Sequence, residues 1–513
     1  MASKLEPAQQ GLARSVVSGA GWSAIATGTR QVLSLACVGV LARLLGPGAY
    51  GLMAMTNVVM GFALNFRDLG TAAAVIRSAD VSEDLLSSLF WLNLVIGVAL
   101  SFAVFLSAWP TAAFFQEPRL VSLLAVLSTS FLVTSSGVVH NAILSRRLAF
   151  RSIAIADIAS AAGGYVVAIG GATAGLGVWS LVFSNLANAI ISTVSYWLAA
   201  RWTPRLKFNF TEIRSIAGFS LNLSGFGLVN YFARNADNIV IGRFLGKEAL
   251  GLYQMAYTLM LYPIQNISSV LGQVLLPAFS RIQADNERFR EAYVRSSMLT
   301  AMIAFPVMAG MAVVADPLVR AVFGPVWLPV IPLFQILAPV GLVQSLQTSV
   351  GHIYIAKGKT GQMFAWSVGA TSVLVLSFLI GVKFGVRGVA ISYALSYLFV
   401  LSYAGFRIPF RLIDLSFRDF ARALMPQMWI SLVMTAVCAL WLLTLGWMGF
   451  NGPWLRLVSA VLLGMAVYTG MMARVRPAAV RCLEATIEGS NLTAAKRVLR
   501  KIGFFPESQS ALV

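Results

Sequence analysis

The sequence predicts an all-α polytopic membrane protein with about 14 transmembrane helices, arranged as two pseudo-symmetric six-helix lobes followed by a C-terminal hairpin. Three observations lead to this prediction. Of the 513 residues, 58% are hydrophobic and only 11% are charged, whereas a soluble domain has roughly 25% charged residues. Apolar runs long enough to cross a bilayer recur along the chain. A glycine-containing motif near residue 42 returns 200 residues later, as expected of a chain built from two similar halves.

The helix boundaries follow from apolar runs that end at Gly, Pro or charged residues. In chain order, the predicted helices cover residues 16–41, 49–66, 85–108, 120–143, 152–170, 176–200, 215–241, 249–279, 294–315, 329–355, 362–382, 386–406, 424–446 and 454–473. The polar start of the chain does not resemble a cleaved signal peptide, so we expect it to be cytoplasmic. With that orientation, most of the 38 Lys and Arg residues lie in cytoplasmic segments, including a basic C-terminal tail.

This distribution also explains the formal net charge of +19. The positive-inside rule accounts for the basic residues, so we expect membrane lipids and no nucleic acid as partners. Cys37, Cys438 and Cys482 lie far apart and predict neither a disulfide framework nor a metal site. The sequence contains no G-x-x-x-x-G-K-[ST] motif and no loop long enough for a soluble domain. It therefore predicts no catalytic residue, no cofactor and no enzyme activity.

The repeated motif reads ARLLGPGAYGLMAM from Ala42 and GRFLGKEALGLYQM from Gly242. Six predicted helices separate the two copies, so both halves have the same orientation in the membrane. The predicted organisation is an N-lobe at 1–200, a basic cytoplasmic linker at 201–214, a C-lobe at 215–406, a linker with the last two helices at 407–474, and a basic cytoplasmic tail at 475–513. Within the motif, Gly46 and Gly246 suit helix C-caps, and Gly51 and Gly251 suit close helix packing.

Two segments carry a family resemblance. These are ARLLGPGAYGL after the first helix and, more specifically, RNADNIVIGRFLGKEALGLYQMAYTLMLYPIQNISSVLGQVLLPAFSRIQAD from Arg234 to Asp285. They resemble the polysaccharide transporter (Wzx-like) branch of the multidrug/oligosaccharidyl-lipid/polysaccharide exporter superfamily. The resemblance implies two lobes around a central cavity with alternating access. It also implies a flippase that moves undecaprenyl-diphosphate-linked oligosaccharide repeat units across the bacterial inner membrane for exopolysaccharide or lipopolysaccharide biosynthesis, with the pathway's polymerase and glycosyltransferases as partners.

A flippase for such a lipid needs cations and amide groups inside the membrane, where an unpaired charge costs at least ~2.5 kcal/mol. Arg30 lies midway along the first helix, and Arg234 lies in the seventh at the place equivalent to Ser34. We therefore expect the two arginines one helical turn apart in depth, where they could clamp the diphosphate. The candidate sugar-binding amides are Asn57, Asn230, Gln265 and Asn266.

Asp237 is the candidate coupling carboxylate, because a proton- or sodium-driven exchanger needs an acid inside the membrane. Since Asp237 follows Arg234 by three residues, a local salt bridge is the alternative. Asp157 is a second intramembrane carboxylate, which we expect to reach the inner surface. His140 and His352, near predicted helix ends, are interpreted as solvated or capping side chains.

Three other functions remain open. A drug/cation antiporter of the same superfamily would need a carboxylate-rich N-terminal cavity, whereas the first four predicted helices contain almost no acidic residue. A lipid-II flippase would handle a related lipid. A membrane glycosyltransferase or O-antigen-type polymerase would need a large outer loop with catalytic residues, and the predicted outer loops are short.

Overall fold

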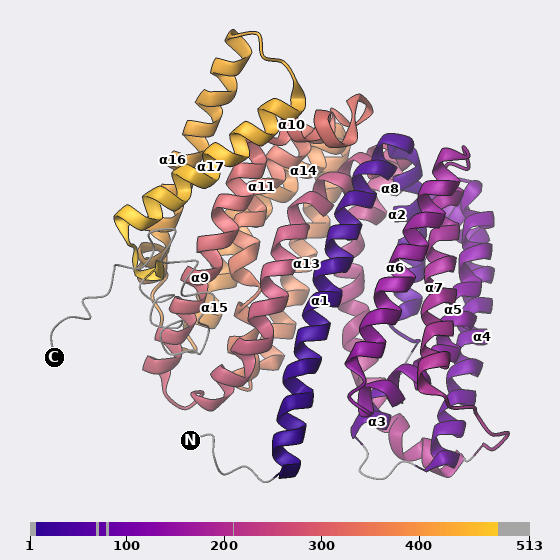
Figure 1. The fold of residues 1–513 in the computed structure, drawn as a ribbon. Helices are drawn as coiled ribbons and strands as arrows, with labels where there is room; N and C mark the ends of the chain where they lie inside the picture. Colours follow the sequence, from indigo (N-terminus) through magenta and orange to yellow (C-terminus); the bar gives the residue numbers. More distant parts are fainter. Residues whose placement is uncertain (1–6, 68–70, 78–81, 209, 481–513) are drawn as a thin grey trace. The chain divides into compact units, whose positions relative to one another are not determined.

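The computed structural model describes residues 7–67, 71–77, 82–208 and 210–480, and in these ranges every regular element is a helix (Figure 1). The helices up to residue 281 are α1 (Pro7–Leu44), α2 (Pro47–Leu64), α3 (Thr71–Arg77), α4 (Glu83–Phe115), α5 (Arg119–Arg146), α6 (Phe150–Thr173), α7 (Val178–Ala200) and α8 (Phe210–Arg281). They are followed by α9 (Asn286–Val313), α10 (Ala315–Leu318), α11 (Val330–Gln347), α12 (Val350–Ala356), α13 (Thr360–Gly381), α14 (Gly385–Leu395), α15 (Ser402–Phe410), α16 (Phe417–Trp447) and α17 (Pro453–Val475). Short π and 3-10 segments are η1 (Val319–Phe323), η2 (Pro325–Trp327), η3 (Val382–Phe384) and η4 (Ser396–Leu401).

The all-α membrane fold predicted from the sequence is confirmed. Each predicted range has a helical counterpart, and two predicted helices are joined in α8, which turns at Gly246. In the described part of the chain, 11 stretches are long and apolar enough to cross a membrane. One of these, Thr360–Phe410, is 51 residues long and covers two predicted helices. The total number of spans stays a prediction.

Large apolar side chains cover the outside of these helices. Phe102, Val166, Leu198, Phe399 and Trp447 are each more than half exposed. Such extensive apolar surface is unfavourable in water but suits contact with lipid tails. The helices satisfy their own backbone hydrogen bonds, as the bilayer core requires. The chain is therefore a multi-pass membrane protein.

The chain divides into two compact units, residues 1–251 and 252–513. The long helix α8 contributes its first part to the first unit and its second part to the second unit. The predicted lobes, linker and tail have other boundaries and stay predictions.

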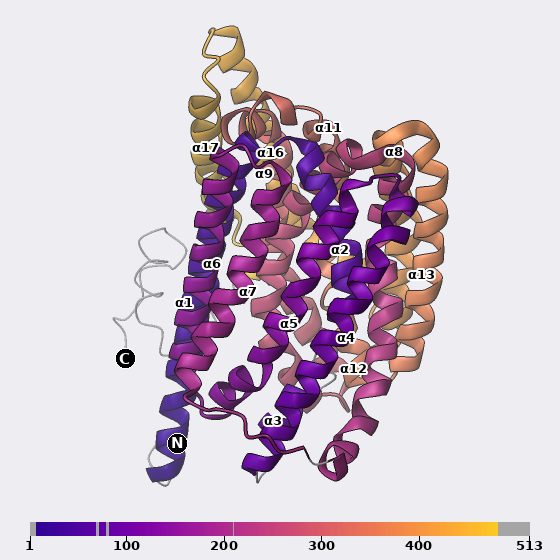
Figure 2. The ribbon, with the colours of Figure 1, turned by 90° about the vertical axis from the view of Figure 1, so that its right-hand side faces the viewer.

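In the first unit, α1, α2, α4, α5, α6 and α7 run alongside one another (Figure 2). Small residues allow close approach between neighbours. For example, α1 buries Cys37 and Leu41 against Ala168 and Ala172 of α6. Helix α2 packs against both α5 and α7, and α5 packs along α7. These three helices therefore surround a common space.

The two copies of the repeated motif pack against each other within the first unit. Gly51 lies against the carbonyl group of Lys247, and Gly251 lies against the carbonyl group of Pro47. The two contacts are equivalent under the 200-residue offset, the reciprocal pattern of a two-fold contact. A methyl group on either glycine would overlap the facing carbonyl oxygen. The predicted close packing of Gly51 and Gly251 is confirmed.

Gly46 and Gly246 occupy equivalent positions in the motif but differ in backbone conformation. Gly246 has φ 80° and ψ −176° and turns the chain inside α8. This region of backbone conformation favours glycine. Gly46 has φ −76° and ψ 170° and is the N-cap of α2, followed by Pro47 at the first helical position. The predicted C-cap at Gly46 is wrong, because its extended backbone begins a helix.

His140 lies in an aromatic enclosure at the end of α5. It is fully buried, and its ring stacks on Trp197 with the two ring centroids 4.1 Å apart. Its Nε2 is 3.2 Å from the carbonyl oxygen of Trp202, and the indole of Trp202 in turn donates to Glu83 Oε2 at 2.8 Å. The interpretation of His140 as a solvated side chain is wrong, because aromatic rings enclose it. Its contact with the carbonyl of Trp202, just after the end of α7, agrees with the alternative of a capping role. His352 is half-buried.

An aromatic core holds the second unit together. Phe279 of α8, Phe289 and Tyr293 of α9, Phe410 of α15 and Phe420 of α16 are buried in one cluster. Helix α16 packs along α9, and α17 packs along α16 as a hairpin (Figure 1). The aromatic side chains therefore fix the C-terminal hairpin to the body of the second unit.

Candidate functional site

A polar cavity of about 540 Å³ lies in the first unit between α2, α5 and α7. Its polar lining consists of Asn57 and Arg67 from α2 and the residues just after it, Ser130, Thr134 and Asn141 from α5, and Asn185, Asn188, Ser192, Thr193 and Tyr196 from α7. No carboxylate occurs among the described residues that line this cavity. The cavity therefore combines amide groups, hydroxyl groups and one guanidinium.

The sequence places these side chains on one face of each helix. The relevant residues are Ser130, Thr134, Gly137 and Asn141 on α5, and Asn185, Asn188, Ser192 and Tyr196 on α7. Steps of three and four residues return to the same side of an α-helix at each turn. The predicted site omits both faces, although the spacing of polar residues in the predicted helices 120–143 and 176–200 is a readable signal.

The cavity offers donors and acceptors for a ligand rich in hydroxyl groups. Ser130 donates to the carbonyl oxygen of Leu127 at 2.6 Å, and Thr134 donates to that of Ser130 at 2.8 Å. Their hydroxyl oxygens keep lone pairs that can accept a hydrogen bond from a ligand. Asn57 and Asn188 are exposed to the cavity. Their amide groups can both donate and accept, which matches the hydroxyl groups of sugars.

The charged groups near the cavity are Arg67, just after the end of α2, and the pair of Arg30 and Asp157. Arg67 lines the cavity, and its Nε is buried without a hydrogen-bond partner in the described part of the chain. Tyr196, which also lines the cavity, donates its hydroxyl to Asp157 Oδ1 at 2.7 Å. The other oxygen of Asp157 is 3.2 Å from Nη1 of Arg30. Arg30 is therefore linked to the cavity edge through Asp157 and Tyr196.

Two of the predicted site residues lie at this cavity or beside it. Asn57 lines it, and Arg30 belongs to the ion pair at its edge. Asp157 is held between Arg30 and Tyr196, and its reach to the inner surface stays a prediction. Arg67 directly follows the predicted helix 49–66, where the sequence indicates only a cytoplasmic basic residue, because nothing in its local sequence shows that the end of α2 borders a cavity.

The remaining predicted residues lie on α8. Arg234 is exposed in the first unit, and Gln265 is exposed in the second unit. Asp237 is only 5% exposed, and its Oδ1 accepts a hydrogen bond from the backbone N–H of Asn238 at 2.8 Å. The side chains of residues 230 and 266, predicted as Asn230 and Asn266, lie outside the described part of the structure. The clamp formed by Arg30 and Arg234 and the coupling role of Asp237 stay predictions.

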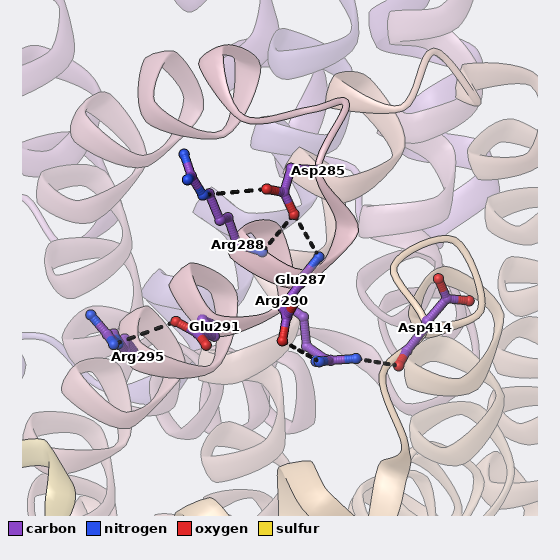
Figure 3. Close-up of polar contacts among 7 residues, drawn as sticks. All are labelled: Asp285, Glu287, Arg288, Arg290, Glu291, Arg295 and Asp414. Carbon is purple, nitrogen blue, oxygen red and sulfur yellow. Dashed lines mark hydrogen bonds and ion pairs between the residues drawn. The ribbon is translucent and has the colours of Figure 1, made fainter.

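A second charged cluster lies at the start of α9 in the second unit (Figure 3). Asp285 caps the helix and accepts hydrogen bonds from the backbone N–H groups of Glu287 at 3.0 Å and Arg288 at 3.1 Å. The Arg288 side chain pairs with Asp285 at 3.3 Å, and Arg290 donates to the carbonyl oxygen of Asp414 at 3.3 Å. Since both arginines have partners, this cluster fastens the helix start to the chain before α16.

A multi-pass helical protein with a cavity lined by amides, hydroxyls and a guanidinium has the architecture of a membrane transport protein, because polar groups inside a membrane face cavities and substrate pathways. The chain belongs to the polysaccharide biosynthesis protein family, whose sequence profile matches residues 40–332. The family resemblance inferred from the sequence is thereby confirmed.

Several relatives share much of the chain. The teichuronic acid biosynthesis protein TuaB of Bacillus subtilis is 28% identical over 380 residues, covering 73% of this chain and 78% of that protein. The lipopolysaccharide biosynthesis protein WzxC of Escherichia coli is 29% identical over 387 residues, covering 75% and 79%. The succinoglycan biosynthesis transport protein ExoT of Rhizobium meliloti is 27% identical over 357 residues, covering 69% and 72%.

Solved structures show where else this fold occurs. The lipid II flippase MurJ in an inward closed conformation has a TM-score of 0.69 at 17% identity, covering 88% of this chain and 98% of that one. An inward-facing multidrug resistance transporter of the MATE family has a TM-score of 0.59 at 17% identity, covering 75% and 94%. At this identity the similarity concerns the fold alone, which these transport proteins share with the present chain.

Proposed function

We propose that the protein is a flippase that moves undecaprenyl-diphosphate-linked oligosaccharide repeat units across the bacterial inner membrane by alternating access. The names of its relatives, which include lipopolysaccharide biosynthesis and succinoglycan transport proteins, support this proposal. The product would serve exopolysaccharide or lipopolysaccharide synthesis. Both termini would be cytoplasmic, and the pathway's polymerase and glycosyltransferases would be its partners.

The observation that carries the proposal is the charge of the cavity. Arg67 lines it together with 18 residues that are neutral polar, apolar or glycine, and no described lining residue is acidic. A diphosphate is attracted to guanidinium groups, which bind phosphate oxygens with paired hydrogen bonds. A cationic drug would instead need a carboxylate in the cavity wall. The cavity therefore favours an anionic substrate.

In this proposal the protein binds and moves its substrate and breaks no covalent bond, so it is not an enzyme. Arg67 and Arg30 would attract the diphosphate, and the amides and hydroxyls of α5 and α7 would bind sugar hydroxyls. The prenyl tail would stay in lipid, because moving its apolar surface through a polar cavity would be unfavourable. We also keep as proposals the substrate-binding roles of Arg234, Asn230, Gln265 and Asn266 and the coupling role of Asp237.

The test is a bacterial strain from which the gene has been deleted. We expect lipid-linked repeat units to accumulate, measured by mass spectrometry of extracted lipids, while the exported polymer disappears. A plasmid copy of the wild-type gene should reverse both changes. Normal polymer with a raised sensitivity to cationic drugs would instead identify a drug/cation antiporter. Loss of lipid-II transport with normal polymer would identify a lipid-II flippase.

A further inference from the structure

Asp157 holds the guanidinium of Arg30 at the edge of the cavity. One carboxylate oxygen is 3.2 Å from Nη1 of Arg30, and the other accepts the hydroxyl of Tyr196 at 2.7 Å. Tyr196 lines the cavity itself. The carboxylate thus has two partners, a guanidinium on α1 and a phenol on α7, while its own backbone is in α6.

A phosphate oxygen at the place of this carboxylate oxygen would find the guanidinium of Arg30 as its partner. Guanidinium and hydroxyl groups both donate to phosphate oxygens, and Arg–phosphate pairs use the same geometry as Arg–carboxylate pairs. Arg67 lines the same cavity as Tyr196, at the ends of α2 and α7. A phosphate at this end of the cavity would therefore meet two guanidinium groups, provided that Asp157 released Arg30.

The ion pair is accessible enough for exchange. The side chain of Arg30 is 45% exposed and that of Asp157 is 23% exposed. Partly exposed pairs contribute little net stability, so a competing anion can replace the carboxylate at low cost. A free arginine inside the membrane is costly, however. The carboxylate of Asp157 neutralises the charge of Arg30 whenever no substrate is bound.

We infer that Asp157 occupies the place of a substrate phosphate group in the ligand-free protein, and that the lipid diphosphate displaces it from Arg30. After displacement, Asp157 keeps its hydrogen bond from Tyr196. The carboxylate thereby limits the affinity of the site and helps to expel the diphosphate when transport is complete. This inference rests on the proposed function, because it names the phosphate subsite of that function and the group that competes for it.

A purely structural salt bridge predicts a different result. If Asp157 only held α1 to α6, its neutralisation would loosen Arg30 and weaken anion binding. If Asp157 competes with the substrate, its neutralisation must strengthen anion binding, and only through Arg30. The sign of the change in affinity therefore separates the two roles.

The experiment measures the affinity of the purified full-length protein in detergent for undecaprenyl diphosphate, which carries no sugar. Asp157→Asn keeps the size of the side chain and an oxygen for Tyr196. We expect it to lower Kd about two- to fivefold, the factor equivalent to a partly exposed ion pair. In an Arg30→Ala background, the same substitution should leave Kd unchanged.

Asp84→Asn is the matched control, because Asp84 forms a 3.1 Å pair with Lys207 outside the cavity. It should not change Kd. Equal or weaker binding by Asp157→Asn, or tighter binding that persists without Arg30, overturns the inference and leaves the proposed function intact. If the wild-type protein and every variant fail to bind undecaprenyl diphosphate, the proposed function fails and this inference fails with it.

Discussion

Replacing Gly51 by Ala tests the contact between the two copies of the repeated motif. The added Cβ would overlap the carbonyl oxygen of Lys247, whereas real Cβ atoms essentially never come within 3.0 Å of a neighbour. The obstructing atoms belong to the backbone, so no side-chain rotation relieves the overlap. The chain around residues 47–51 must move away from the chain around residues 247–251.

We expect Gly51→Ala to lower the free energy of unfolding by about 3 kcal/mol, the upper end of the range for overpacked sites. This corresponds to a fall of roughly 6–12 °C in the Tm of a unit of this size. Gly251→Ala should have a similar effect, because Pro47 faces it in the reciprocal way. The double variant should lose much less than the two effects added together, since one separation relieves both overlaps.

Gly46→Ala is the matched control within the same motif. No atom lies within 4 Å of the Cβ that would be added there, and φ is −76°. Because Gly46 is only an N-cap without a side-chain hydrogen bond, we expect a loss below about 1 kcal/mol. The assay is thermal unfolding of the purified protein in detergent, followed by tryptophan fluorescence. Equal midpoints for Gly51→Ala and Gly46→Ala would refute the reasoning.

Three further predictions follow from single residues. Arg67→Gln removes the guanidinium that lines the cavity. It should reduce polymer export at least about tenfold, if the hydrogen bond lost to the diphosphate is worth about 1.5 kcal/mol or more. The control is Arg288→Gln, on an exposed arginine paired with Asp285, which should leave export unchanged; equal export by both variants would contradict the role of Arg67. Asp285→Ala removes the cap of α9 and should cost about 1 kcal/mol in thermal unfolding, whereas Asp285→Asn should retain most of that stability. Gly246→Ala places a side chain at φ 80° and should cost about 1–2 kcal/mol, so a midpoint as high as that of Gly46→Ala would show that the backbone there relaxes freely.

The fold can be predicted from the sequence because membrane insertion depends on local composition. Each apolar run has to be long enough to cross the hydrocarbon core, and Gly, Pro and charged residues mark its ends. The ranges 120–143 and 176–200, for example, correspond to α5 and α7 with shifts of a few residues at most. The repeat at Gly51 and Gly251 is likewise visible in the sequence, and its glycines indicate close packing.

The candidate site can be predicted from the sequence only in part. Arg30 and Asn57 were recognised because polar residues inside an apolar run are costly and therefore noticeable. Arg67 was not, since an arginine just beyond a helix end is the ordinary sign of a cytoplasmic boundary. The pairing of Arg30 with Asp157, 127 positions apart in the chain, also escaped prediction, because no local pattern links the two residues.

The sequence by itself therefore determined which segments are helices within the membrane, that the chain carries an internal repeat, and to which family it belongs. Only the tertiary structure decided that α2, α5 and α7 line one polar cavity, that Arg67 lines it too, and that Asp157 holds Arg30 at its edge. The physical reason is that insertion depends on the residues of one segment at a time. The rotation of each helix about its axis depends on packing against its neighbours, and that rotation decides which polar faces meet.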